Sequence, residues 1–265
     1  IKILIPTIGW SLIFIFWKVY VDQWEPSIWP LVKNVLYQPS YYHLWFMYTL
    51  IGLYLVLPLF SAFVRSENEE TIFYLIIIWF LFTCLFPILD TSFDLKVGLE
   101  VPGASGYIGF FLLGYLMGKR EFSNIDFYLA ALVFVISVGL AAYLTFHQTQ
   151  PVDYVVETFY GNFSPTVMFM SVSSFVLIKG ISSRVDFSTG WLSYGPKLGV
   201  VTFGIYLIHP LWIGAVAYTP VKSIFEPEIM HPWLSIPLRA ILVFTLSALS
   251  VWIMQKTPLV NKLVP

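Results

Sequence analysis

Charged residues are scarce in this chain. Asp, Glu, Lys and Arg together make up 11% of its 265 residues, whereas a soluble domain has roughly 25%. Hydrophobic residues make up 58%, so the folded chain could not cover its surface with polar groups in water. A net charge of −1 also argues against a nucleic-acid partner. We therefore expect membrane lipid to be the solvent of this protein.

Cysteine is almost absent, because Cys84 is the only one. An intrachain disulfide is excluded, and the place of Cys84 in an apolar run predicts a buried, unreactive thiol. The chain also lacks zinc-type ligand spacing, a phosphate-cradling glycine loop and a nucleophile elbow. We therefore expect no bound metal and no bound cofactor, and residue spacing alone does not reveal a catalytic centre.

Long apolar runs dominate what is present. Eight segments each approach the roughly 20 residues that a membrane-spanning helix needs, and the fourth is the shortest. They are Leu4–Val21, His43–Val64, Thr71–Leu89, Tyr107–Gly118, Phe127–Phe146, Phe163–Ile181, Leu198–Tyr218 and Ser235–Gln255. No barrel-type alternation or internal repeat accompanies them. The sequence predicts an all-α, polytopic transmembrane helix bundle of about eight spans, forming one domain over residues 1–265.

The loops between these segments predict an orientation. With the N-terminus in the cytoplasm, nine Lys and Arg residues fall on the inside and five on the outside, which the positive-inside rule favours. The outer loops are longer and rich in Trp and Tyr. These aromatic residues are expected to anchor helices at the lipid headgroups, and stacking on a sugar is the alternative interpretation.

His43 lies at the outer end of the second segment, beside Trp45 and Tyr48. Water is near at this depth, so placement at the interface is enough to explain a histidine there. Aromatic platforms next to a hydrogen-bonding ring also suit a carbohydrate. A structural role and a catalytic or sugar-contacting role for His43 are therefore both open.

The seventh segment carries a polar helix face. Thr202, Tyr206 and His209 lie three or four residues apart and so share that face. Pro210 removes a backbone donor and frees the carbonyl of Tyr206. An ionisable side chain at bilayer depth usually marks a functional site. For His209, contact with substrate and structural packing against a neighbouring helix are both open.

Two further patterns lead to packing predictions. Gly114 and Gly118 form a small-xxx-small pair that would let another helix approach closely. Arg239, near the start of the last segment, can extend toward the interface, where we expect it to pair with a carboxylate of an outer loop.

Three strings resemble the membrane acyltransferase 3 family, in the family's order and spacing. They are Tyr42–Pro58 (which contains His-Leu-Trp-Phe and Tyr-Thr-Leu-Ile-Gly-Leu-Tyr-Leu-Val-Leu-Pro), Gly109–Lys119 (Gly-Phe-Phe-Leu-Leu-Gly-Tyr-Leu-Met-Gly-Lys) and Thr202–Pro210 (Thr-Phe-Gly-Ile-Tyr-Leu-Ile-His-Pro). The resemblance implies a polysaccharide O-acyltransferase. It spans nearly the whole chain, which makes it more specific than any one string.

The resemblance also implies that this acyltransferase 3-like domain is incomplete at its N-terminus. The family usually has ten spanning helices, and its first two normally carry an Arg, a His about ten residues later and a Phe-Phe-x-x-Ser-Gly string. None of these is present here, and Ile1–Pro6 resembles the entry to the family's third helix. The expected catalytic Arg and His would then lie upstream, and this chain alone is expected to be inactive.

The function that the resemblance implies is transfer of an acyl group, usually acetyl in the family, from cytoplasmic acyl-CoA to a sugar hydroxyl of an envelope polysaccharide or glycolipid. The expected location is the plasma membrane, in bacteria the inner one. The implied site residues are Lys2 for acyl-CoA, His209 and His43 as catalytic candidates, and Trp45, Tyr48, Tyr206 and Thr202 for the acceptor. A non-catalytic transporter or flippase is the competing interpretation, since a proline-broken helix and eight spans fit it too.

Overall fold

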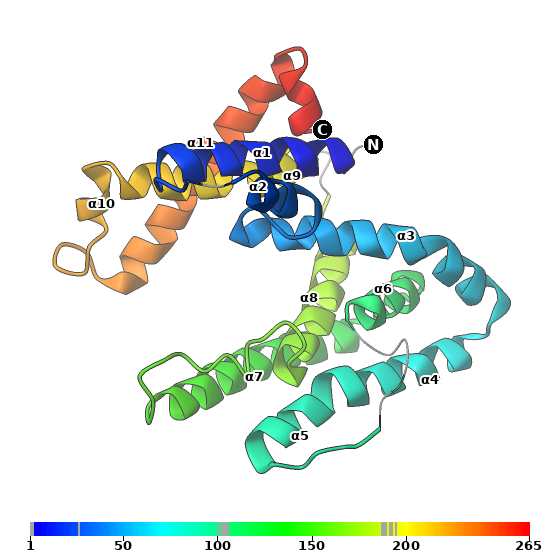
Figure 1. Cartoon of the computed structure of the whole chain (residues 1–265). Coiled ribbons are helices and arrows are strands. Elements are labelled where there is room, and N and C mark those ends of the chain that lie inside the picture. Colours follow the sequence, from blue (N-terminus) through cyan, green and yellow to red (C-terminus); the bar gives the residue numbers. More distant parts are fainter. Residues whose placement is uncertain are drawn as a thin grey trace. The chain divides into compact units, whose positions relative to one another are not determined.

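A computed structural model describes residues 3–25, 27–99, 101, 106–186, 190, 193 and 195–265. These residues form helices and no strand, which confirms the all-α prediction. The helices are α1 (Leu4–Tyr20), α2 (Ile28–Leu36), α3 (Trp45–Ser66), α4 (Glu69–Trp79), α5 (Phe86–Phe93), α6 (Ile108–Lys119), α7 (Asn124–Thr149), α8 (Pro165–Arg184), α9 (Gly195–Ala217), α10 (Val221–Ile224) and α11 (Pro232–Lys256) (Figure 1). Short segments complete them: the 3-10 helices η1 (Tyr42–Leu44) and η4 (Val260–Leu263), and the π-helical η2 (Phe80–Leu85).

Each of the eight predicted segments coincides with a helix in the described part of the chain. Six helical stretches are long and apolar enough to cross a membrane: Tyr42–Ser66, Glu69–Phe93, Asn124–Thr149, Pro165–Arg184, Leu198–Ala217 and Pro232–Lys256. The other two, α1 and α6, are shorter apolar helices. At 1.5 Å per residue α6 is ~18 Å long, less than the hydrocarbon thickness of ~30 Å. The chain is a polytopic helix bundle.

Local sequence signals set the starts of two of these helices. Ser123 and Asp126 form a capping box at α7, in which each side chain accepts a hydrogen bond from the backbone N–H of the other. The carboxamide oxygen of Asn68 accepts from the N–H of Thr71 at the start of α4. These caps satisfy backbone donors that the first helical turn leaves unpaired.

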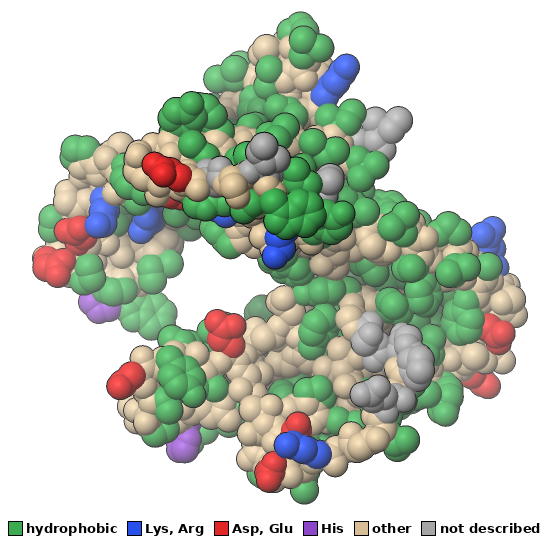
Figure 2. All heavy atoms as spheres, in the orientation of Figure 1, with side chains coloured by type: hydrophobic (Ala, Val, Ile, Leu, Met, Phe, Trp, Pro, Cys, Tyr) green, Lys and Arg blue, Asp and Glu red, His purple; other side chains and the backbone are tan. Residues whose placement is uncertain are grey.

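The chain divides into two compact units. Residues 1–54 and 187–265 form unit 1, which holds α1, α2, the start of α3, and α9 to α11. Residues 55–186 form unit 2, which holds the rest of α3 and α4 to α8. In Figure 2 hydrophobic side chains are spread over the whole face that is drawn, and charged side chains occur only in scattered places. This is the surface expected of spanning helices that contact lipid.

Unit 1 has a core that ties the two ends of the chain together. Trp10 and Phe14 of α1 pack with Leu44 and Leu207 in a buried apolar cluster. The indole N–H of Trp10 donates to the carbonyl of Leu263, 2.9 Å away. The helices α9 and α11 contact each other along this unit. The core thus holds η1 and α9 together, which matters for the candidate site.

In unit 2, α4 packs on α6 through Ile72, Ile76, Leu112 and Leu116, and α7 contacts α8. The ammonium of Lys179 in α8 donates to backbone carbonyls at the C-terminal end of α6, at 2.8 Å to Gly118 and 2.6 Å to Arg120. A cation there satisfies carbonyls that the helix leaves free.

The predicted glycine contact in α6 is wrong in position. A Cβ atom added at Gly114 or Gly118 would meet nothing within 4 Å among the described residues. At Gly109, in contrast, it would lie 1.8 Å from the buried ring of Trp79. The close approach between α4 and α6 therefore occurs at the N-terminal end of α6. The indole of Trp79 fills the space that a side chain at position 109 would occupy.

Candidate active site

The histidines singled out in the sequence, His43 and His209, lie side by side in unit 1. Their ring centroids are 5.4 Å apart and their planes are nearly perpendicular. The hydroxyl of Tyr206 in α9 donates to the backbone carbonyl of His43 in η1, across 163 residues of sequence. Two strings from distant parts of the chain thus form one polar cluster, which we call the histidine cluster: His43, Tyr206 and His209.

Pro210 prepares the carbonyl that orients His209. Proline has no N–H to donate to the carbonyl four residues earlier, so the Tyr206 carbonyl is left without its helical partner. The Nδ1 atom of His209 lies 2.7 Å from that carbonyl oxygen. The sequence-based prediction that Pro210 frees this group is consistent with the observed geometry. A carbonyl can only accept, so Nδ1 carries a proton, and in the Nδ1–H tautomer Nε2 is the nitrogen with the lone pair.

In His43 the other ring nitrogen, Nε2, makes the hydrogen bond to the backbone. Its Nε2 lies 3.3 Å from the carbonyl oxygen of Leu207, so Nε2 is the donor. The side chain is only 5% exposed, and its Nδ1 has no hydrogen-bond partner among the described residues. Aromatic rings enclose it: Phe14 lies 4.9 Å away and Tyr206 5.4 Å, both edge-on. His43 therefore braces α9 against η1 through its Nε2–H, and its ring lies beside that of His209.

A pocket opens next to the histidine cluster, between α9 and α11. Its volume is about 540 Å³. We call it the Arg239 pocket; its lining residues are Ile205, His209, Ile213, Ile236, Arg239, Ala240, Val243 and Phe244. Apart from His209 and Arg239 the lining is apolar. The arrangement places one proton acceptor and one permanent cation in a hydrocarbon-lined space, which suits an amphiphilic ligand that carries a negative charge.

The predicted ion pair of Arg239 with an outer-loop carboxylate is wrong for the residues that the structure describes. No acidic side chain lies within 4.0 Å of it there, and Glu226 is 3.9 Å from Lys222 instead. The Lys222–Glu226 pair forms because the two residues are one turn apart in the connection before α11. Sequence reasoning missed the shared pocket of Arg239 and His209, because it depends on how α9 and α11 pack.

The other residues predicted for the acceptor lie apart from the Arg239 pocket. Tyr48 donates its hydroxyl to the carbonyl of Val35, at 2.8 Å, and so holds α3 to α2. Trp45 is 39% exposed, and its ring lies 6.0 Å from that of Phe46. Thr202 is exposed and donates to the carbonyl of Gly199 in its own helix. Lys2, the predicted acyl-CoA residue, lies outside the described residues.

Of these residues, Tyr206 alone joins the histidines in the structure. Within the described side chains, neither Trp45, Tyr48 nor Thr202 lines the Arg239 pocket or makes a ring or hydrogen-bond contact with His209. Thr202 precedes Tyr206 by four residues, or about one turn of α9, and so lies on the N-terminal side of the histidine cluster. These residues remain predictions for acceptor contact.

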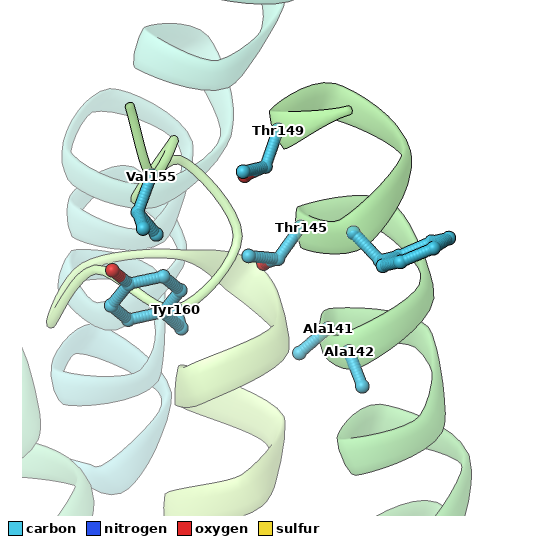
Figure 3. A pocket seen from close by; sticks show the side chains of 7 residues that line it. Ala141, Ala142, Thr145, Thr149, Val155 and Tyr160 are labelled. Atoms are coloured by element: carbon cyan, nitrogen blue, oxygen red, sulfur yellow. The ribbon is translucent and has the colours of Figure 1, made fainter. Parts of the chain in front are cut away.

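A second pocket lies in unit 2, where the loop after α7 folds back on the helix. In Figure 3 the side chains of Thr145 and Thr149 from α7 point toward Val155 and Tyr160 from the loop. The pocket has a volume of about 360 Å³ and an apolar lining. Partial burial and the nearby carboxylate of Glu157 raise the pKa of Tyr160, so its hydroxyl keeps its proton at neutral pH. No base or cation lines this pocket among the described side chains, so it does not rival the first as a site for chemistry.

The donor set of the histidine cluster does not suit a metal. Among the described residues, no three His, Cys, Asp or Glu side chains lie close enough together to hold an ion. The chemistry that the geometry offers is proton transfer at His209 Nε2 and anion binding at Arg239.

A family model described as an acyltransferase domain matches residues 1–254. A comparison with curated proteins and one with solved structures found no match. The matched range contains the histidine cluster and the whole Arg239 pocket.

Proposed function

The chain belongs to the acyltransferase 3 family of multi-pass membrane proteins, and from that premise we propose that it is an O-acyltransferase of the cell envelope. The donor is cytoplasmic acyl-CoA, with acetyl as the acyl group, and the acceptor is a sugar hydroxyl of an envelope polysaccharide or glycolipid. The family match over residues 1–254 favours this reaction over the transporter interpretation.

His209 is the general base in this proposal. Transfer of an acyl group from a thioester to an alcohol forms a C–O bond and breaks a C–S bond, so the hydroxyl must lose a proton and the thiolate must gain one. The Nε2 lone pair of His209 accepts the hydroxyl proton, because Nδ1 is already bonded to the Tyr206 carbonyl. The fixed ring orientation saves the entropy of positioning the base for each reaction. This observation, Nδ1 held and Nε2 left for substrate, carries the proposal.

The depth of the site supports an acceptor-side location. His209 lies eight residues from the end of α9 and so ~12 Å from it along the helix axis. That end faces the same side of the membrane as the start of α11, since a short connection joins them. In the proposed orientation, with the N-terminus cytoplasmic, this side is the outer one. Lys2 would meet the CoA phosphates at the opposite side, and Trp45 and Tyr48 would lie nearer the acceptor.

Replacing His209 tests the proposal. The full gene product is expressed in membranes that contain the envelope acceptor, and acyl-CoA-dependent acylation of the glycan is measured. We expect His209→Ala to lower the rate by about 10²- to 10⁴-fold, the range of a lost general base. His147, at the exposed end of α7, is the matched control, and His147→Ala is expected to leave the rate unchanged.

Two results would contradict the proposal. One is acylation by the His209→Ala protein at the rate of the unmodified protein. The other is an unmodified protein that is folded and membrane-inserted but consumes no acyl-CoA with any envelope glycan, which would return the transporter interpretation. The thermal unfolding of both variants in detergent shows whether the substitution acts on the reaction or on the fold.

A further inference from the structure

Arg239 is a permanent cation on α11, a helix that is long and apolar enough to span a membrane. It makes no hydrogen bond or ion pair with any residue that the structure describes. A charged side chain at membrane depth normally pairs with another group or lines a polar path. The missing partner therefore points to a bound anion.

The walls of the Arg239 pocket indicate where that anion comes from. Ile236 is 68% exposed and Phe244 is 44% exposed, although both lie on a helix that is long and apolar enough to span the membrane. Exposed apolar side chains on such a helix contact lipid chains rather than water. Because Ile236, Phe244 and Arg239 line one pocket, the pocket can receive a hydrocarbon chain and a charged group from the same molecule.

The depth of Arg239 fits the phosphate level of a lipid. It lies seven residues from the start of α11, or ~10 Å along the axis. A 25-residue helix is ~37 Å long and extends beyond a hydrocarbon core of ~30 Å on both sides. The Cα of Arg239 is therefore only a few residues inside the boundary, and its long side chain can reach back to the headgroup region.

We propose that the Arg239 pocket binds a phosphate-bearing lipid, with the phosphate on the guanidinium and the chain along Ile236, Val243 and Phe244. Guanidinium binds phosphate oxygens through two parallel N–H donors, which a single apolar pocket with one arginine can supply. The inference rests on the proposed function in one respect: it assigns the acceptor to glycolipids whose sugar is joined to the chain through phosphate. His209 lines the same pocket.

Lipid binding without acyl transfer tests the pocket directly. The full gene product is purified in a neutral detergent and titrated with phosphatidylglycerol, and the lipid retained on each protein is counted by native mass spectrometry. We expect one tight site for phosphatidylglycerol and at least tenfold weaker retention of diacylglycerol, which has the same chains and no phosphate. Arg239→Gln is expected to weaken phosphatidylglycerol binding at that site about tenfold, since it removes charge-assisted hydrogen bonds.

Matched variants separate the pocket from general charge effects. Arg65 in α3 is the control, because its guanidinium bonds Ser61 in its own helix and lies outside the pocket. Arg65→Gln should leave the tight site unchanged, and Arg239→Lys should retain most of the binding. Ala240→Trp fills the pocket while Arg239 stays in place, so it should lose the site even if Arg239→Gln does not fold.

The inference is overturned if Arg239→Gln and Ala240→Trp, both folded, bind phosphatidylglycerol like the unmodified protein. It is also overturned if inorganic phosphate displaces the lipid at equal concentration, because the site would then recognise a free anion. Neither result depends on acylation. If Arg239→Gln loses phosphatidylglycerol binding while His209→Ala still acylates at full rate, this inference stands and the proposed function fails. If Arg239→Gln binds the lipid normally while His209→Ala loses acylation, the proposed function stands and this inference fails.

Discussion

At the residue scale, the histidines of the cluster divide their tasks through their backbone partners. The Nδ1–H of His209 donates a hydrogen bond to the carbonyl of Tyr206, and the Nε2–H of His43 donates one to the carbonyl of Leu207. Both carbonyls belong to the turn of α9 that Pro210 interrupts. The proline is thus a chemical feature of the site, since without an N–H at position 210 the Tyr206 carbonyl is free to select the tautomer of His209.

Replacing Pro210 tests this assignment. Pro210→Ala restores an N–H that competes with His209 Nδ1 for the Tyr206 carbonyl. A carbonyl oxygen has two lone pairs, so the histidine bond should weaken rather than vanish, and we expect the acylation rate to fall several-fold. The ¹⁵N chemical shifts of histidine-labelled protein report the tautomer directly. Pro58→Ala, at the exposed proline inside α3, should change neither quantity; an unchanged tautomer in Pro210→Ala would refute the role given to the proline.

At the element scale, the packing of α6 depends on one glycine of its three. Gly109 faces the buried indole of Trp79, which in turn donates its N–H to the carbonyl of Gly106 at 2.8 Å. Gly114 and Gly118 have open space around them among the described residues. Among the three glycines of α6, Gly109 is therefore the one whose lack of a side chain makes room for a neighbouring helix.

This difference predicts opposite effects for two similar substitutions. Gly109→Ala overlaps the Trp79 ring, so we expect it to lower the free energy of unfolding by about 1–3 kcal/mol. Gly114→Ala meets no neighbour and gains helix propensity, so its effect should be neutral or stabilising by up to about 1 kcal/mol. Thermal unfolding in detergent, followed by helical circular dichroism, compares them. Equal stability of the two variants would mean that α4 does not pack on α6 at Gly109.

At the scale of the whole molecule, lipid exposure and helix length determine the architecture. The long helices carry large apolar side chains outward, such as Leu55 and Leu59 of α3 and Val135 of α7, because no aqueous surface has to be covered there. Most of the charged residues lie at helix ends and in connections. Their distribution is the basis of the predicted orientation, with the N-terminus of this chain in the cytoplasm.

Cysteine labelling in whole cells checks that orientation. In a Cys84→Ala background, a cysteine is placed at Glu121, before α7, or at Asp153, after it. Both positions are exposed in the structure. We expect a membrane-impermeant maleimide to label Asp153→Cys in intact cells and Glu121→Cys only after permeabilisation. The opposite pattern would reverse the proposed topology, and labelling of both from one side would mean that α7 does not cross the membrane.

The sequence alone predicted much of this fold because hydropathy is a local property. Each of the eight apolar runs became a helix, and the shortness of the fourth reappears in α6. The amphipathic helix α2 was not predicted, since nine residues beside an interface carry too little apolar length to stand out. The residues around His43 and His209 identified both segments as candidates for a site. The distance between the two histidines could not be predicted, because it depends on how η1 and α9 pack.

The sequence by itself determined that lipid is the solvent, where the helices run and which carbonyl Pro210 leaves free, because each of these follows from residues within one or two turns of chain. Only the tertiary structure decided that His43 meets His209, that Arg239 shares a pocket with His209 and has no carboxylate partner among the described residues, and that Gly109 is the glycine in contact. Those facts depend on the rotation and register of packed helices. Interactions between side chains far apart in sequence select that register, and no single segment encodes it.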